Sequence, residues 1–275
     1  MPQKRKMQKE ETQEDSLNIL VSNDDGIWAK GLHVLTEALA GVPGNQVYVS
    51  APDGQRSACG HGISMLEPLK IYTREVKGAV WARSISGTPA DSVKFGIKYL
   101  KKEMEVDIDV VFSGINHGGN IGSDVHYSGT VSAAAEGILC GVPAVAVSLG
   151  THNPTDEMLE NCATLIQEIS VKAVPNLDKK TLLNVNFPPV EPNSIKGLRI
   201  TRLGPREYNE SFDVLKNPRG QEYCWYSGEI VRFEGLDEDT DTEAQQEGYI
   251  SITPLQLDMT DYSMRNRVKA WNLKF

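Results

Sequence analysis

Short apolar runs alternate with helical patterns along residues 18–186 of this 275-residue chain. Ile19–Val21 is one such run, and it ends abruptly at polar residues and a glycine, as a buried strand does. Leu32, Leu35 and Leu39 follow at helical spacing. Strands and helices that alternate in this way predict an α/β fold with a mostly parallel, doubly wound sheet.

The same patterns predict the other elements of this region. Thr88-Pro89 opens a helix, with Thr88 as the N-cap and Pro89 in the first turn. The further predicted strands are 47–50, 69–73, 79–85, 107–112, 142–149 and 182–186, the second and third of them forming a hairpin. Helices are predicted over 30–40, from 89, from 128 and over 157–171.

The pattern changes beyond residue 190, where predicted strands at 198–203, 222–233 and 249–253 have no regular helices between them. The acidic run at 237–243 reads as a solvated loop, and a helix is predicted over about 260–273. The chain therefore divides into a disordered segment, an α/β core and a β-rich extension with a C-terminal helix that is used for oligomer contacts. Their residues are 1–16, 17–190 and 191–275.

Charge and cysteine usage narrow the choice of partners and compartment. The net charge is −9 and the pI is near 5.2, which argues against a nucleic-acid polymer or an anionic membrane as a partner. No apolar run approaches the length of a membrane span. The four cysteines are scattered without a Cys-x-x-Cys pair, so we expect a reduced, cytoplasmic protein without structural zinc.

Polar side chains follow three of the predicted strands where each strand ends. Asp24 and Asp25 follow the first strand, Ser57 lies in the loop after the next, and Asn116 follows 107–112. The carboxyl ends of parallel strands share one edge, where ligands bind. Adjacent carboxylates can reach one ligand only from a turn, which Gly26 permits. These oxygens suit Mg²⁺, Mn²⁺ or Ca²⁺. The alternative for the Asp pair is a capped strand-to-helix loop.

A second candidate site lies in the glycine-rich segment 113–130. Ser128, Gly129 and Thr130 stand where a helix begins, so free backbone N–H groups and hydroxyls there form an anion site. The segment lacks the Gly-Lys-Ser/Thr ending of a Walker A loop. A metal-type cluster beside an anion-type cluster indicates a phosphate ester held against a divalent cation.

Several motifs in order between residues 17 and 271 resemble the survival protein SurE family. They are Ser22-Asn-Asp-Asp-Gly26, Ala51-Pro-Asp53 with Arg56-Ser57, Ser86-Gly-Thr-Pro89, Ser113-Gly-Ile-Asn116, Tyr127-Ser-Gly-Thr-Val131 and Ser251-Ile-Thr-Pro-Leu255. The resemblance implies a Rossmann-like core and a metal-dependent 5′-nucleotidase that hydrolyses nucleoside monophosphates. It also implies a homodimer or homotetramer whose C-terminal regions exchange elements between subunits.

Site roles follow from position and resemblance together. We expect one divalent cation per subunit, Mg²⁺ or Mn²⁺, held by Asp24, Asp25, Ser57 and Asn116. The expected catalytic residues are Asp24 and Asp25, with Asp24 favoured for the proton. The expected phosphate-binding residues are Asn116, Ser128, Gly129 and Thr130. The sequence does not determine which nucleobase is preferred, or whether the substrate is a 5′-phosphate, a 3′-phosphate or polyphosphate.

The roles of several histidines and of Arg56 are open. His117 and His126 flank the glycine-rich loop as proton-transfer candidates or surface residues. His61 is a candidate to cover the substrate, and Arg56 contacts either the substrate or a local carboxylate.

Two rival functions are also open. One is an aspartyl-phosphate phosphatase of the haloacid dehalogenase type. It is disfavoured because such enzymes place the second Asp two residues after the first, whereas Asp24 and Asp25 are adjacent. The other is a regulatory module that binds nucleotide without hydrolysing it.

Overall fold

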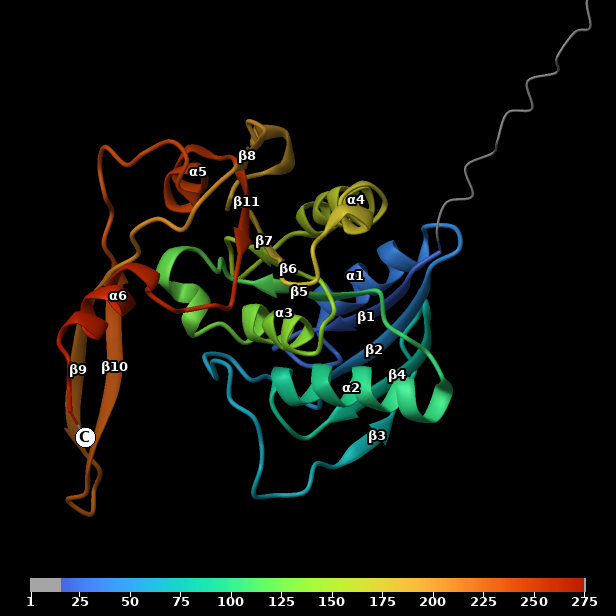
Figure 1. Ribbon diagram of the computed structural model, residues 1–275, viewed down its shortest axis with the longest axis horizontal. Coiled ribbons are helices and arrows are strands. Elements are labelled where there is room, and N and C mark those ends of the chain that lie inside the picture. The colour runs from blue at the N-terminus through green and yellow to red at the C-terminus, as the bar shows by residue number, and fades with distance from the viewer. Residues whose placement is uncertain (1–15, 275) are drawn as a thin grey trace, which may run out of the picture.

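The computed structural model describes residues 16–274, so the segment predicted for residues 1–16 lies outside it except for Ser16. Within this range a nine-stranded sheet forms the centre of the fold, in the order β3-β4-β2-β1-β5-β6-β7-β11-β8 (Figure 1). Its strands are β1 (Asn18–Ser22), β2 (Gln46–Pro52), β3 (Ile71–Thr73), β4 (Ala79–Ile85), β5 (Val110–His117), β6 (Ala144–Leu149), β7 (Leu182–Phe187), β8 (Leu198–Ile200) and β11 (Ile250–Leu255).

The sheet is mostly parallel, as the sequence predicts. The six strands from β4 to β7 in the sheet order pair in parallel with one another. β3 pairs antiparallel with β4, which confirms the predicted hairpin. At the other edge β11 runs antiparallel to β7, and β8 runs parallel to β11.

Helices cover both faces of the sheet (Figure 1). On one face α1 (Lys30–Ala40) and α4 (Asp156–Lys172) pack around a core that includes Ile19 and Val21. On the other face α2 (Pro89–Met104) and α3 (Gly129–Leu139) pack around a core that includes Leu20. Alternate side chains of β1 therefore enter opposite cores, as expected for a strand buried on both faces.

Helix starts follow local capping chemistry. The Thr88 hydroxyl accepts a hydrogen bond from the Asp91 backbone N–H, and the Asp91 carboxylate accepts one from the Thr88 N–H. This reciprocal capping box satisfies two N–H groups that the first turn leaves unpaired. Thr155 caps α4 through a single hydrogen bond, which its hydroxyl accepts from the N–H of Met158. Both helices begin within one residue of their predicted starts.

The strand order reverses at β1, which lies between β2 and β5. In open α/β sheets, the carboxyl ends of strands at such a reversal form the crevice where ligands bind. Asp24 follows β1, Ser57 follows β2 after a short loop, and Asn116 is the second-last residue of β5. The topology therefore brings the predicted ligands to one edge of the sheet.

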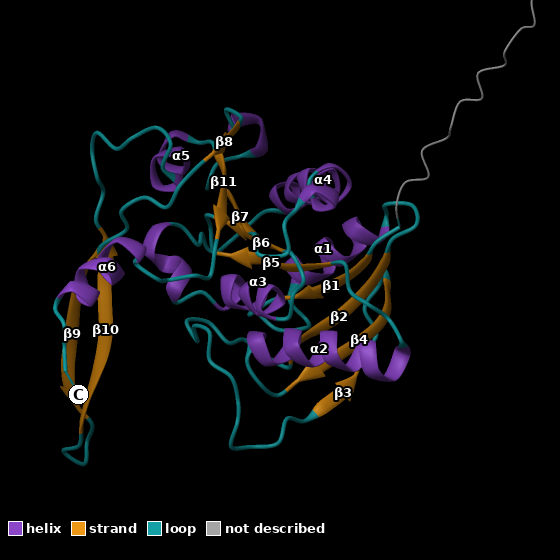
Figure 2. Ribbon diagram, viewed as in Figure 1, coloured by secondary structure: helices purple, strands orange, loops and turns teal. Residues whose placement is uncertain are grey.

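Residues 191–275 contribute to the same sheet and also form a separate hairpin. β8 and β11 extend the main sheet, whereas β9 (Tyr208–Lys216) and β10 (Glu222–Ile230) pair only with each other in the two-stranded second sheet. Figure 2 shows this hairpin projecting from the body; α6 (Tyr262–Ala270) is the last helix of the described residues. The extension predicted for residues 191–275 thus shares the central sheet with residues 17–190.

Several expectations need correction. The acidic run at 237–243 is not a solvated loop: it leads into α5 (Asp241–Glu247), and Asp241 is fully buried. β5 continues to His117, through the first part of the predicted glycine-rich loop. β9 has no counterpart among the predicted strands, and α6 is shorter than predicted. Among residues 16–274, no helix combines the length and apolar character needed to cross a membrane.

Candidate active site

A closed turn presents the two carboxylates after β1. The Asn23 side chain donates to the Gly26 carbonyl at 2.9 Å and accepts from the Gly26 N–H at 3.2 Å. Gly26 has a φ of +97°, and a Cβ there would lie 2.9 Å from the carbonyl carbon of Gly54. Glycine is therefore required at this position, and the buried Asn23 fixes a turn that takes Asp24 and Asp25 out of the strand.

Asp24 is buried, at 5 % exposure, and contacts the start of α3. Its Oδ1 accepts a hydrogen bond from the Thr130 hydroxyl at 2.5 Å. Burial raises the pKa of Asp24 to about 6; the Thr130 hydrogen bond opposes this rise, and the negative charge of Asp25 adds to it. A raised pKa shows that the protein groups around Asp24 do not fully compensate its charge.

Asp25 supplies a second uncompensated carboxylate oxygen. Its Oδ2 is buried and has no hydrogen-bond partner among residues 16–274. Buried polar atoms without a partner are rare, and each calls for an explanation such as a bound ion or water. Two neighbouring carboxylates, one buried and one with an orphaned oxygen, fit a cation held between them.

Asn116 and Ser57 reach the same edge from β5 and β2, the two strands that flank β1. The Asn116 Nδ2 donates to the Gly118 carbonyl at 2.7 Å, which leaves Oδ1 as the free acceptor of the amide. Ser57 is exposed, and its hydroxyl accepts from Gln55 Nε2 at 3.0 Å. The loop that carries Ser57 is fastened to the Asp turn, because the Arg56 N–H donates to the Asp24 carbonyl at 2.7 Å.

The N-terminus of α3 lies directly against Asp24. A Cβ built on Gly129 would stand 2.6 Å from the Asp24 Cβ and 2.9 Å from its Oδ2. Ser128 is the N-cap, and its hydroxyl accepts from the Val131 N–H at 3.0 Å, which leaves its own proton free to donate. The positive end of the helix dipole therefore adjoins the carboxylate pair.

Comparison with known proteins assigns the family. The family model described as survival protein SurE matches residues 19–210. A protein named 5′-nucleotidase SurE from Symbiobacterium thermophilum is 42% identical over 259 residues, covering 94% of this chain and 99% of that protein. The chain belongs to the SurE family. The crystal structure of the SurE protein from Aquifex aeolicus aligns with a TM-score of 0.75 at 36% identity, covering 93% of this chain and 100% of that one.

A second relative extends the same relationship. The 5′-nucleotidase SurE of Pelotomaculum thermopropionicum is 45% identical over 256 residues, covering 92% of this chain and 94% of that protein. These alignments span the SurE motifs, from the Asp turn to the C-terminal strand β11. The resemblance read from the sequence is therefore confirmed.

The donor set of this SurE chain fits a hard divalent cation. Residues 16–274 contain no group of three or more His, Cys, Asp or Glu side chains arranged for a metal. A cation at the β1–β5 edge would instead meet two carboxylates and the neutral oxygens of Asn116 and Ser57. Oxygen-only ligands of this kind match Mg²⁺ or Mn²⁺ better than zinc.

Arg56 and His61 contact local carboxylates in this SurE structure. The Arg56 guanidinium forms an ion pair with Asp53 at 3.0 Å and also donates to the Gly87 and Ser86 carbonyls. The His61 Nε2 lies 2.9 Å from the Glu136 carboxylate, so the imidazole faces α3. These contacts hold the loop after β2 against α2 and α3.

The sequence did not single out Glu136, which is a buried charge on α3. Its side chain is 2% exposed and pairs with His61 and with Lys94 Nζ at 2.8 Å. Burial opposes its ionisation, but the hydrogen bonds from His61 and Lys94 outweigh burial and lower the pKa of Glu136. The sequence signal that could have identified Glu136 is that it is a single acidic residue within a run of small residues on α3.

The remaining histidines have different surroundings. The His117 Nε2 is buried without a partner in the described part of the chain, whereas His126 is exposed at the end of the short 3₁₀ helix η1 (Gly122–His126). His152 is exposed, with its Nδ1 2.9 Å from the His117 carbonyl oxygen. His33 lies in α1, with its Nε2 3.1 Å from the Ile27 carbonyl oxygen. None of these contacts reaches the Asp24 carboxylate.

Proposed function

We propose that this chain is a divalent-metal-dependent phosphomonoesterase that hydrolyses nucleoside 5′-monophosphates to nucleoside and phosphate. The single observation that carries the proposal is the contact between the carboxylate pair and the α3 N-terminus, since a Cβ on Gly129 would stand 2.6 Å from the Asp24 Cβ. This contact sets a cation-binding group beside an anion-binding group. The name 5′-nucleotidase, carried by the relatives, supplies the substrate class.

The residues that would hold the cation are Asp24, Asp25, Ser57 and Asn116, with one Mg²⁺ or Mn²⁺ per subunit. The orphaned Oδ2 of Asp25 and the raised pKa of Asp24 support this assignment. A bound divalent cation polarises a phosphate oxygen and lowers the pKa of water, so that hydroxide becomes available near neutral pH.

The residues of the chain would perform the other parts of the reaction. The first-turn N–H groups of Gly129 and Thr130, the Ser128 hydroxyl and the Asn116 amide hold the phosphate oxygens. The Thr130 hydroxyl is already committed to Asp24, so Thr130 binds phosphate through its backbone. Asp24 orients the attacking water and accepts its proton, because Thr130 and the Asn23 turn fix its position.

The test measures phosphate release from nucleoside 5′- and 3′-monophosphates and short polyphosphate, with Mn²⁺, with Mg²⁺ and with chelator. We expect 5′-monophosphates to be hydrolysed only when metal is present. Asp25→Asn is expected to lower the activity by more than about 100-fold, which exceeds the usual effect of changing a residue that only hydrogen-bonds a metal ligand. Asp239→Asn is the matched control, since Asp239 is exposed and distant in sequence. Full activity in chelator or in Asp25→Asn would falsify the proposal.

A binding readout accompanies the turnover assay. Mn²⁺ at about 100 times its Kd stabilises the folded protein by about 2.7 kcal/mol if it binds only the native state. Wild type and Asp239→Asn are expected to show this stabilisation, and Asp25→Asn to lack it. A trapped phosphoenzyme would instead support the haloacid-dehalogenase-type rival, and metal and nucleotide binding without turnover would support the regulatory module.

Oligomer state and compartment complete the proposal. The β9–β10 hairpin exposes large apolar side chains, among them Phe212 and Trp225 at 65% each, and Trp271, directly after α6, is 57% exposed. A lone two-stranded hairpin is marginally stable, and exposed apolar surface of this kind marks an interface. We propose a homodimer or homotetramer joined through these elements. The unpaired cysteines support the cytoplasm as its compartment.

A further inference from the structure

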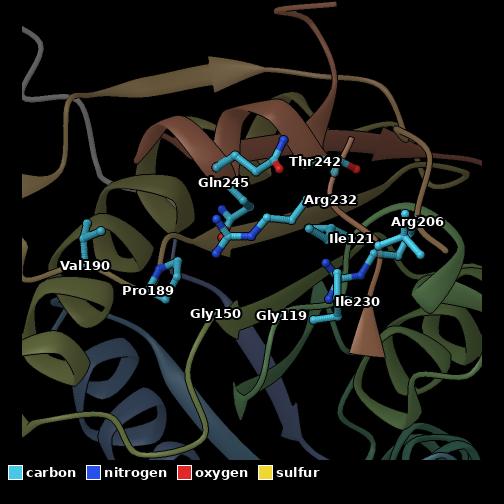
Figure 3. Close-up of a pocket in the computed structure, with 12 residues that line it drawn as sticks. Gly119, Ile121, Gly150, Pro189, Val190, Arg206, Ile230, Arg232, Thr242 and Gln245 are labelled. Atoms are coloured by element: carbon cyan, nitrogen blue, oxygen red, sulfur yellow. The ribbon is translucent and has the colours of Figure 1, made fainter. Parts of the chain in front are cut away.

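A cavity lies beyond the carboxyl ends of β5 and β6, apart from the carboxylate pair. It has a volume of about 550 Å³, within the range of small-molecule sites. Figure 3 shows its walls, which come from Gly119 and Gly150 in the strand-end loops, Gln245 on α5 and Arg232 after β10.

The cavity adjoins the strand end that carries Asn116. Gly119 lies three residues after Asn116, so the two Cα atoms are at most about 11 Å apart. The loops are held together, because the Gly118 N–H donates to the Leu149 carbonyl at 2.8 Å. A Cβ on Gly119 would stand 3.6 Å from the Gly150 Cα, which is ordinary van der Waals contact, so the two loops lie against each other. A ligand anchored at Asn116 can therefore extend toward this cavity.

The charge of the cavity does not match a polyanion. Arg206 lines it, but its Nε is paired with the Asp124 carboxylate at 3.0 Å. Arg232 is exposed and has no carboxylate within ion-pair distance among residues 16–274. Figure 3 shows the Arg232 side chain extending across the cavity. A single free guanidinium beside apolar side chains suits the face of a flat heterocycle, on which a guanidinium stacks.

The apolar part of the wall comes from several segments. Its side chains are Ile121, Pro189, Val190 and Ile230. Apolar walls with a few convergent polar groups are typical of sites for small organic ligands.

Gln245 provides a fixed acceptor at the cavity wall. Its Nε2 donates to the Asn186 carbonyl at 2.9 Å and to the Tyr249 carbonyl at 3.3 Å. With its nitrogen engaged, the amide presents Oε1 toward Gly150, where a Cβ would stand 3.2 Å from that oxygen. Asn186 in turn accepts from the Asn120 N–H at 2.8 Å, so the wall is braced against the glycine-rich loop. An acceptor held in this manner is suited to an N–H donor at the edge of a ring.

We propose that this cavity receives the base of the nucleoside monophosphate, with Arg232 stacking on the ring and Gln245 Oε1 accepting a hydrogen bond from an N–H on its edge. The assignment rests on the proposed function, since the phosphate anchors at Asn116 and the α3 N-terminus. Arg232 and Gln245 then determine preference among substrates without taking part in the chemical step.

The test compares a nucleoside 5′-monophosphate with ribose 5-phosphate, which has the phosphate and sugar but no base. Arg232→Ala is expected to raise KM for the nucleotide on the order of tenfold, with kcat unchanged and with ribose 5-phosphate unaffected. The free nucleoside, measured as a competitive inhibitor, is expected to lose affinity by the same factor. Arg83→Ala, which removes an arginine on β4 near the opposite edge of the sheet, is the matched control.

Arg232→Lys separates stacking from charge, because lysine keeps the charge but lacks the planar guanidinium. We expect it to raise KM for the nucleotide alone. Wild-type KM for the nucleotide in Arg232→Ala, or an equal rise for both substrates, would overturn the assignment while leaving the proposed function standing. If wild type hydrolyses neither substrate with metal present, the proposed function itself fails and the cavity assignment with it.

Discussion

The Thr130 hydroxyl donates a hydrogen bond to the Asp24 carboxylate at 2.5 Å, although 106 residues separate the two in the chain. This contact joins the turn after β1 to the first turn of α3. It orients one oxygen of Asp24 and leaves the other beside the Gly129 backbone. The carboxylate and the helix N-terminus therefore form one rigid unit. A substitution in either part is expected to displace the other.

Thr130→Val tests this unit, because valine keeps the shape of threonine and removes the hydroxyl. We expect a 10–100-fold loss of metal affinity or of kcat/KM, the range seen when an outer-shell partner of a metal ligand is removed. Steady-state kinetics and Mn²⁺ titration measure the two effects. Thr130→Ser restores the donor and is expected to recover most of the loss; equal defects in both variants would contradict the role of the hydrogen bond.

Gly129→Ala tests the close approach of α3 to Asp24. The added Cβ would meet the Asp24 Cβ at 2.6 Å, a distance that real Cβ atoms do not show, so the helix start or the carboxylate must shift. We expect kcat/KM to fall by at least about tenfold, since small misplacements of reacting groups are costly. Gly54→Ala is the control, because a Cβ there has no atom within 4 Å. Unchanged activity in Gly129→Ala would show that the contact is unimportant.

The fold was predictable because its signals are local. Apolar periodicity located the strands and helices of residues 18–186, and Thr88 and Thr155 mark helix starts through contacts three residues away. β9 was missed because its Asn, Glu and Asp residues lower strand propensity, and only its pairing with β10 defines it. Pairing partners are not visible in a single segment.

For the candidate site, the sequence indicated which positions lie at one edge of the sheet but not which contacts they make. Strand ends located Asp24, Asp25 and Asn116, since parallel topology brings such positions together. The partners of Glu136 lie 75 and 42 residues away, and one of the N–H groups bound by Asp241 lies 119 residues away. Packing alone determines these pairs, so an acidic run that looked solvated contained a buried carboxylate.

Glu136→Gln is expected to destabilise the protein at pH 7 by about 1.5–3 kcal/mol, because hydrogen bonds to a charged carboxylate are lost at a buried site. The pKa of Glu136 is lowered on folding, so its stabilisation is present above the unfolded pKa of about 4.3 and is lost as the pH falls through the folded value. Urea unfolding from pH 7 to pH 3 measures the difference between wild type and variant, which should shrink toward zero in acid.

Glu103→Gln is the control for that series. Glu103 pairs with Lys102 at the surface, where its side chain is 46% exposed, and surface pairs contribute about 0–1 kcal/mol. A pH-independent gap between wild type and Glu136→Gln would contradict a charged Glu136 as the stabilising species.

Asp241→Ala tests whether the C-terminal part of the chain braces the loop before α3. The buried Asp241 carboxylate accepts from the Gly122 N–H at 2.9 Å and from the Gly204 N–H at 2.7 Å, so it ties α5 to η1 and to the segment after β8. Alanine leaves both N–H groups without a partner, and we expect unfolding free energy to fall by about 2–4 kcal/mol. Asp239→Ala, at an exposed position in the same acidic run, should change it by less than about 1 kcal/mol. Chemical denaturation of the two variants decides the matter: similar stabilities would mean that the buried carboxylate does not hold these segments together.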